Sequence, residues 1–262
     1  MRLLVLLFAV PMVSAATPPI AQNVSDATLV ESDQKTGDVS TNELRRIIDG
    51  RTAVVLDARP PQEFATSHIP GAQNVAPQPG RAAHLYVSDV MEVGRLLKGD
   101  KDRPLILYCN GPFCGKSKRL ATELVEAGYL KVSRYQLGAP GWRALAGAAM
   151  QTELSALRYI RTDPTAVWVD AREPSQFTTE TIPAARNIPL SGLRPGKDHG
   201  VVKEAKDDGR LPMQDHNTRV VVFGTGGDDA RTVADAIARE AFHNVSFVSA
   251  PFETVRRALA ER

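Results

Sequence analysis

Short runs rich in strand-forming residues recur along the chain and alternate with stretches of helical character. The runs fall into two groups of three, at 53–56, 105–108 and 131–136 in the first half and at 166–169, 219–223 and 245–248 in the second. The most apolar of them, such as 53–56 and 105–108, are continuous rather than alternating, which is typical of parallel strands covered on both faces. The pattern therefore predicts an α/β fold in which parallel sheets are flanked by helices.

Helix-like segments separate these runs, and some of their ends carry residues that start or stop helices. The segment 41–50 has Ser40 or Thr41 as its N-cap and Gly50 as its stop. Further helices are expected at 88–97, 118–128, 153–159 and 229–242. Each half thus repeats the same alternation of strand and helix.

The two halves also share sequence motifs. Residues 54–64 match residues 167–177, and residues 69–75 match residues 182–188 at the same offset. An ungapped match over two separate motifs indicates duplication of a whole domain. The chain has 262 residues, enough for two domains that each bury a core of their own.

The first residues resemble an export signal. A charged start is followed by an apolar stretch at 3–13 and by small residues at Ala15 and Ala16, and the stretch is too short to span a bilayer comfortably. We expect a signal peptide at 1–16 and a periplasmic or secreted protein without a membrane anchor after cleavage, with an uncleaved membrane anchor as the alternative. The remaining boundaries are expected to be an N-terminal extension at 17–34, a first domain at 35–148 and a second domain at 149–262, joined near 148–152.

The charge balance argues against large anionic partners. The net charge is +2 with both signs interspersed, so no basic face for nucleic acid or lipid headgroups is indicated. Small anions remain suitable ligands.

Comparison of the halves separates scaffold from chemistry. Asp57 and Arg59 recur as Asp170 and Arg172, and we expect them to form structural ion pairs.

Cys109 lies opposite Gly224. The residues of this loop that only the first half carries include Cys109, Cys114, Lys116 and Ser117. The opposing loop has no thiol, and its Asp228 and Asp229 would repel an anionic substrate. The second half is therefore expected to do no sulfur chemistry.

Cys109 has the setting of a nucleophile. It follows the apolar run 105–108 and precedes a Gly/Pro-rich loop that leads into a helix, where backbone N–H groups and the positive helix end stabilise a thiolate. We expect Gly111 and Gly115 to turn N–H groups inward, with Pro112 stiffening the curve between them.

These motifs resemble the rhodanese (sulfurtransferase) family in their order and spacing. The resemblance rests on the run 105–117, on Val54 to Phe64, on Ser67 to Ala72 and on Leu137 to Trp142. It implies two rhodanese-like domains, of which only the first carries the catalytic cysteine. It also implies that Cys109 takes sulfane sulfur from thiosulfate or a similar donor as a persulfide and passes it to a thiophilic acceptor such as a thiol, without metal or organic cofactor. The substrate-binding loop would consist of Asn110, Gly111, Pro112, Phe113, Cys114, Gly115, Lys116 and Ser117.

The loop departs from the common rhodanese pattern. It is longer, it contains a second thiol at Cys114, and Gly115 holds the place of the arginine found in phosphatases of this fold, which disfavours phosphate ester hydrolysis. A permanent disulfide between Cys109 and Cys114 would close only a tiny loop and restrict the unfolded chain little. Cys114 is instead a possible resolving thiol.

Two alternatives to sulfur transfer stay open. One is a periplasmic thiol–disulfide or persulfide reductase that uses Cys109 and Cys114. The other is a non-catalytic sulfur carrier or binding module. Two conspicuous residues have structural interpretations, since we expect His68 to be a hydrogen-bonded turn histidine and Trp142 to pack in the core.

Overall fold

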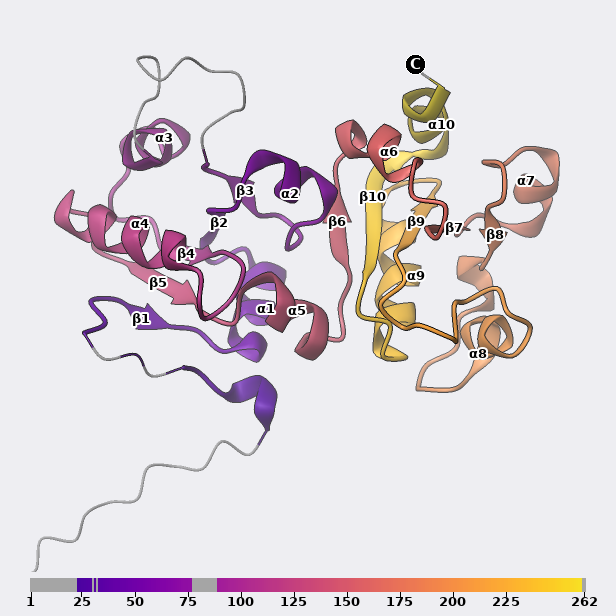
Figure 1. Cartoon of the computed structure of the whole chain (residues 1–262), viewed down its shortest axis with the longest axis horizontal. Coiled ribbons are helices and arrows are strands. Elements are labelled where there is room, and N and C mark those ends of the chain that lie inside the picture. Colours follow the sequence, from indigo (N-terminus) through magenta and orange to yellow (C-terminus); the bar gives the residue numbers. More distant parts are fainter. Residues whose placement is uncertain (1–22, 30, 32, 77–88, 261–262) are drawn as a thin grey trace, which may run out of the picture.

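Two parallel sheets form the frame of the computed structural model, which describes residues 23–29, 31, 33–76 and 89–260 (Figure 1). Within these residues the first sheet has the strand order β1-β5-β4-β2-β3, and the second has the order β6-β10-β9-β7-β8. The strands of the first sheet are β1 (Gly37–Asp38), β2 (Val54–Asp57), β3 (Gln73–Asn74), β4 (Leu105–Tyr108) and β5 (Val132–Tyr135). Those of the second are β6 (Met150–Thr152), β7 (Val167–Asp170), β8 (Arg186–Asn187), β9 (Val220–Gly224) and β10 (Val245–Pro251). The matching orders confirm the predicted α/β fold and its repeat.

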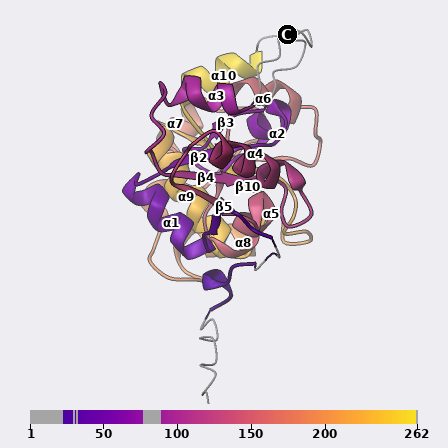
Figure 2. The same ribbon diagram turned by 90° about the vertical axis from the view of Figure 1, so that its left-hand side faces the viewer.

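Helices cover both faces of each sheet. The first domain contains η1 (Val24–Asp26), α1 (Thr41–Gly50), α2 (Pro61–Thr66), α3 (Asp89–Leu96), α4 (Gly115–Glu126) and α5 (Gly138–Leu145). The second contains α6 (Leu154–Ile160), α7 (Pro174–Thr179), η3 (Leu190–Gly192), α8 (Gly200–Asp207), α9 (Gly227–Arg239) and α10 (Phe252–Ala260). The two domains lie side by side along the longest axis of the molecule (Figure 1). In Figure 2, which is turned by 90°, the first domain therefore lies in front of the second.

The central strands are apolar at successive positions because each face of the sheet has its own core. Val55 packs in one cluster with Leu44 of α1 and Trp142 of α5. Its neighbour Leu56 packs in the opposite cluster with Val93 of α3 and Leu120 of α4. Burial of alternate side chains on both faces accounts for the continuous apolar run that the sequence displays.

The start of α1 is as expected, and its end is not. Ser40 caps the helix, and its Oγ accepts a hydrogen bond from the Glu43 N–H at 3.2 Å. Gly50 does not stop the helix but belongs to it, and Arg51 adopts the left-handed conformation with φ of 51°. The Arg51 N–H there bonds the carbonyl groups of the last turn, which closes the helix without glycine.

The segment that joins the domains is itself a strand. β6 pairs with β10 at the edge of the second sheet, and it also contacts the first domain. His68 and Gln151 exchange two backbone hydrogen bonds, at 2.9 and 2.8 Å. The Thr152 hydroxyl donates to the Thr66 carbonyl at 2.9 Å. Residues near 148–152 therefore hold the two domains together.

The expected signal peptide at 1–16 and part of the extension at 17–34 lie outside the described residues. Within the described part of the extension, the Ser25 hydroxyl at η1 donates to the Leu145 carbonyl at 3.3 Å. Across the described ranges, the helices include none with the length and apolar character needed to cross a membrane.

Candidate functional site

An ion pair between Asp57 and Arg59 lies where β2 ends. Both side chains are buried, and the Arg59 Nη2 lies 2.6 Å from Asp57 Oδ2. The same guanidinium donates to the Ser67 carbonyl at 2.7 Å, which holds the turn after α2 against the end of β2. In the second domain Arg172 and Asp170 form the same pair at 2.7 Å. The predicted structural role of this pair is confirmed in both halves.

A buried hydroxyl completes this network differently in each domain. The Tyr108 hydroxyl donates to Asp57 Oδ2 at 2.5 Å and accepts from the Ile69 N–H at 3.1 Å. Burial and the Asp57 charge raise the pKa of Tyr108 well above its ordinary value, so the phenol stays protonated and remains a donor. In the second domain Phe223 lacks the hydroxyl, and Thr181 donates to Asp170 at 2.8 Å instead.

Cys109 is fixed by the backbone that surrounds it. It directly follows β4, it is 1% exposed, and its carbonyl accepts the Ala139 N–H at 3.0 Å. Gly138 lies against this contact with φ of +62°, and a Cβ there would approach the Cys109 oxygen to 2.3 Å and the Gly111 nitrogen to 2.4 Å. Only glycine fits between these atoms, so the start of α5 sets the position of the cysteine loop.

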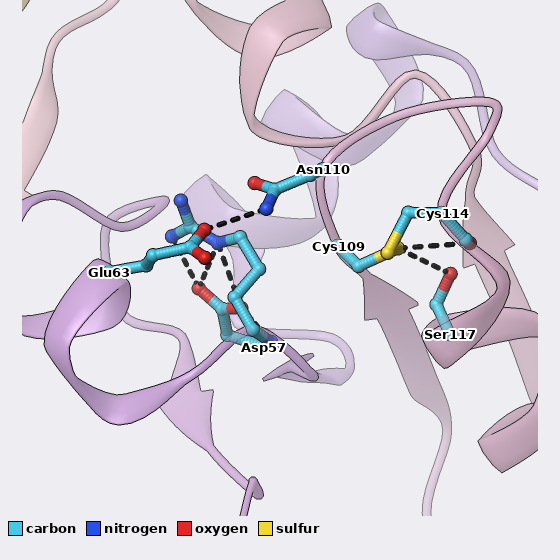
Figure 3. The surroundings of a disulfide bond; sticks show 7 residues. Asp57, Glu63, Cys109, Asn110, Cys114 and Ser117 are labelled. Atoms are coloured by element: carbon cyan, nitrogen blue, oxygen red, sulfur yellow. Dashed lines mark hydrogen bonds and ion pairs between the residues drawn. A yellow bond between two sulfur atoms is a disulfide. The ribbon is translucent and has the colours of Figure 1, made fainter.

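Cys109 and Cys114 form a disulfide in this structure (Figure 3). Their Cα atoms are 6.3 Å apart, which is within the range that a disulfide spans. The two cysteines are five positions apart in sequence, and the loop between them curves enough to bring their sulfur atoms together. The structure therefore describes the oxidised form of the loop.

The surroundings of the Cys109 sulfur differ from the expected ring of N–H donors. Its Sγ lies 3.4 Å from the Ser117 hydroxyl, which can donate to it, and 3.2 Å from the Cys114 carbonyl oxygen. Across 109–117, all of which are described, no backbone N–H bonds the sulfur, and the Cys114 N–H binds the Gly111 carbonyl at 3.0 Å instead. Ser117 is thus the hydrogen-bonding partner of the sulfur in this form.

The two loop glycines have different roles. Gly111 has φ of +99°, a conformation that favours glycine, as expected. The same expectation for Gly115 is wrong, because Gly115 has no positive φ and is the first residue of α4. Helical dihedral angles are open to every residue, so this position does not require glycine.

The other predicted loop residues make no hydrogen bond to the sulfur. Asn110 donates to Glu63 Oε2 at 2.6 Å, and Figure 3 shows this pair on the opposite side of Cys109 from Cys114 and Ser117. The remaining loop positions Pro112, Phe113 and Lys116 are exposed. The structure thus brings Cys109, Cys114 and Ser117 together and leaves these three at the surface.

His68 and Trp142 have the structural roles expected of them. The buried His68 ring stacks on Phe64 with 3.9 Å between ring centroids, and its Nδ1 lies 2.9 Å from the Phe64 carbonyl oxygen. Burial lowers the pKa of His68 to about 4, so the ring is neutral near pH 7. Trp142 is buried and donates from Nε1 to the Ala149 carbonyl at 3.3 Å.

A cavity of about 580 Å³ lies beside Asn110 at the junction of the domains. Its lining includes Arg59 and Arg143 of the first domain and Tyr159 and Arg219 of the second. Sequence reasoning missed Arg143 and Arg219, because no local motif marks either and they come together only through the packing of the two halves.

The described residues thus place one thiol loop on a duplicated frame, and a family model agrees with the duplication. The model of the rhodanese-like domain matches residues 40–145 and again residues 153–256. The chain belongs to the rhodanese-like domain family. It is a tandem protein in which the first rhodanese-like domain carries both cysteines and the second has Gly224 opposite Cys109.

Solved structures similar to this chain come from larger proteins. Wild-type EanB is 16% identical with a TM-score of 0.40, and the match covers 86% of this chain and 61% of that chain. An anaerobic ergothioneine biosynthesis enzyme from Chlorobium limicola, in complex with trimethyl histidine, is 16% identical with a TM-score of 0.39 over 85% of this chain and 61% of its own. The chain thus spans 61% of the length of either. No curated protein sequence matches it significantly.

Proposed function

We propose that the protein is a sulfurtransferase that carries sulfane sulfur as a persulfide on Cys109. The observation that supports this most is the position of the thiol pair at the β4–α4 loop of a rhodanese-like domain, with the Ser117 hydroxyl 3.4 Å from the Cys109 sulfur. A hydroxyl that donates to sulfur favours the thiolate over the thiol, and the thiolate is the nucleophile.

The reaction begins from the reduced loop. While Cys109 is bonded to Cys114 its sulfur is not a thiolate and cannot act as the nucleophile, so a dithiol reductant must first open the disulfide. The Cys109 thiolate then attacks the outer sulfur of thiosulfate. The S–S bond of thiosulfate breaks, sulfite leaves with the bonding electron pair, and Cys109 becomes a persulfide.

A second nucleophile completes the cycle. Cyanide or an acceptor thiolate attacks the outer sulfur of the persulfide, and the Cys109 thiolate leaves with the electron pair. With cyanide the product is thiocyanate. The donor and acceptor are named here by chemical class, and we place the reaction in the periplasm or outside the cell because of the expected export signal at 1–16.

Steady-state kinetics of the pre-reduced chain test this proposal. Thiocyanate formation from thiosulfate and cyanide is expected to follow double-displacement kinetics, and Cys109→Ser is expected to abolish it. Ser117→Ala should lower the rate constant for attack of Cys109 on thiosulfate about tenfold, since one hydrogen bond to the thiolate is removed. Thr232→Ala, which removes a hydroxyl from the exposed face of α9, is the matched control and should leave the rate unchanged. Full activity of Cys109→Ser would refute the proposal, whereas a single loading of sulfur without turnover would identify a carrier.

The observed disulfide supports a second candidate, a persulfide reductase. In that reaction the Cys114 thiolate attacks the Cys109 sulfur of the persulfide, forms the Cys109–Cys114 bond and expels hydrosulfide; an external dithiol then reduces the disulfide. The 6.3 Å separation of the Cα atoms permits this bond. The reductase predicts that Cys114→Ser still accepts sulfur on Cys109 but releases no hydrosulfide. Equal release of hydrosulfide by wild type and Cys114→Ser would exclude it.

A further inference from the structure

Two arginines line the cavity at the domain junction, and among the described residues Arg143 has no ion-pair partner while Arg219 has only the longer contact to Asp163. Arg143 lies on α5, and its Nη2 donates to the Ser67 hydroxyl. Its Nε is buried and has no hydrogen-bond acceptor. No carboxylate among the described residues forms an ion pair with it. A half-buried guanidinium in this situation lacks the anionic partner that such groups normally have.

Arg219 reaches the same cavity from the second domain, where it precedes β9. Its Nε lies 3.7 Å from Asp163 Oδ2, which is within ion-pair range but too long for a hydrogen bond. That Nε is also buried without an acceptor. Two guanidinium groups from different domains therefore line one cavity, and each has a buried Nε without an acceptor.

The electrostatics agree with this geometry. Burial, followed by the charges of Arg59 and Arg219, lowers the pKa of Arg143. Arg59 is already neutralised by Asp57 beneath it, but Arg143 has no such counter-charge. An anion between Arg143 and Arg219 would relieve the repulsion between the two guanidinium groups.

We propose that this cavity binds an oxyanion group between Arg143 and Arg219. The group belongs either to a sulfur oxyanion, such as thiosulfate or the sulfite that leaves, or to the carboxylate of a small acceptor thiol. Both present oxygen atoms that accept from the edge of a guanidinium. This identification of the ligand rests on the proposed sulfur transfer, whereas the binding of an oxyanion does not.

The walls of the cavity set limits on the ligand. Pro140 and Tyr159 offer apolar surface, and a volume of about 580 Å³ leaves room for an organic portion beside the charged group. Glu63 also lines the cavity, and its carboxylate accepts from Asn110, so it opposes an anion at that side. The anionic group is therefore expected at the arginine side of the cavity.

The proposal assigns a role to the second rhodanese-like domain. It has no thiol, but it supplies Arg219 and Tyr159 to a cavity that begins at Asn110, the residue after Cys109. The second domain would bind ligand for the loop of the first domain without carrying sulfur itself.

Calorimetric titration of the full chain tests the site apart from catalysis. A Cys109→Ser/Cys114→Ser chain can neither transfer sulfur nor form the disulfide, and it is titrated with thiosulfate and separately with S-methylglutathione, at constant ionic strength in chloride. Binding of thiosulfate assigns the site to the inorganic anion, and binding of S-methylglutathione alone assigns it to a carboxylate.

Added single substitutions decide whether the arginines are responsible. Arg143→Gln and Arg219→Gln should each weaken binding of the probe at least about tenfold, because a charge-assisted contact is lost. Glu63→Gln should strengthen binding of the probe severalfold, because it removes a negative charge from the cavity wall. The glutamine amide oxygen can still accept the hydrogen bond from Asn110. Arg158→Ala, which removes an exposed arginine of α6 outside the cavity, is the matched control and should change nothing.

The outcomes separate this proposal from the sulfur transfer. If neither probe binds, or if both glutamine variants bind as tightly as their parent, the oxyanion site is refuted. Arg219→Lys and circular dichroism spectra of all variants guard against loss of fold, and the lysine variant should bind with intermediate affinity. Arginine-dependent binding in a protein whose wild-type form takes no sulfur onto Cys109 would refute the transfer and leave the site intact.

Discussion

Tyr108→Phe tests the idea that a single phenol completes the Asp57–Arg59 network of the first domain. The substitution removes only the hydroxyl, which donates to Asp57 at 2.5 Å and accepts from the Ile69 N–H at 3.1 Å. Loss of a hydrogen bond to a buried charge costs about 1.5–3 kcal/mol, and an unpaired buried N–H adds about 1–3 kcal/mol. We therefore expect the free energy of unfolding to fall by roughly 3–5 kcal/mol.

Tyr135→Phe is the matched control for this prediction. It is the same change in the neighbouring strand β5, but the Tyr135 hydroxyl bonds the neutral hydroxyl of Thr41 at 2.8 Å. Its expected cost is about 1–2 kcal/mol, since a neutral hydrogen bond is lost and the buried Thr41 hydroxyl is left without this partner. Urea unfolding gives the two free energies, and hydrogen exchange of peptides from β2 and β4 shows whether the loss is confined to the first domain. If Tyr108→Phe costs no more than Tyr135→Phe, the charged network does not depend on the phenol.

Two further predictions concern residues that position the site. In the unfolded chain His68 becomes protonated below its ordinary pKa of 6.5, whereas in the folded chain burial keeps it neutral down to about pH 4. The free energy of unfolding should therefore fall as the pH drops from 6.5 to about 4. The loss amounts to up to about 3 kcal/mol, and His68→Gln should remove it; an unchanged pH dependence of the unfolding free energy would contradict the burial argument. Gly138→Ala should destabilise the fold by more than about 2 kcal/mol and abolish sulfur uptake, because its Cβ overlaps the backbone at Cys109 and Gly111. Gly99→Ala, with φ of +81° and open space around it, should cost only about 1–2 kcal/mol, and equal effects of the two on unfolding and uptake would show that the overlap is unimportant.

The central strands could be predicted from the sequence because both faces of each are buried. Val55 and Leu56 contribute to different cores, and this produces the continuous apolar run at β2. The short edge strands gave no such signal. β1 comprises Gly37–Asp38, and β6 lies where only a linker was expected, since both are strands through backbone pairing with a neighbour rather than through their side chains.

The site was predictable only where the duplication exposes it. Comparison of the halves identified the Asp57–Arg59 pair and the thiol loop, because one is repeated and the other is not. The approach of Cys114 to Cys109 depends on the path of the loop, which residue types do not determine. Arg143 and Arg219 come from different domains, so their shared cavity is a property of the domain packing alone.

Mass spectrometry of the pre-reduced chain after exposure to thiosulfate tests sulfur transfer most directly. Peptides alkylated before digestion show which cysteine carries added sulfur, and a second sample treated with cyanide shows whether that sulfur can leave. The account predicts that the Cys109 peptide gains one sulfur atom in wild type and in Cys114→Ser, and that cyanide removes it as thiocyanate. A Cys109 peptide that gains no sulfur, or sulfur found on Cys114 instead, would contradict the account.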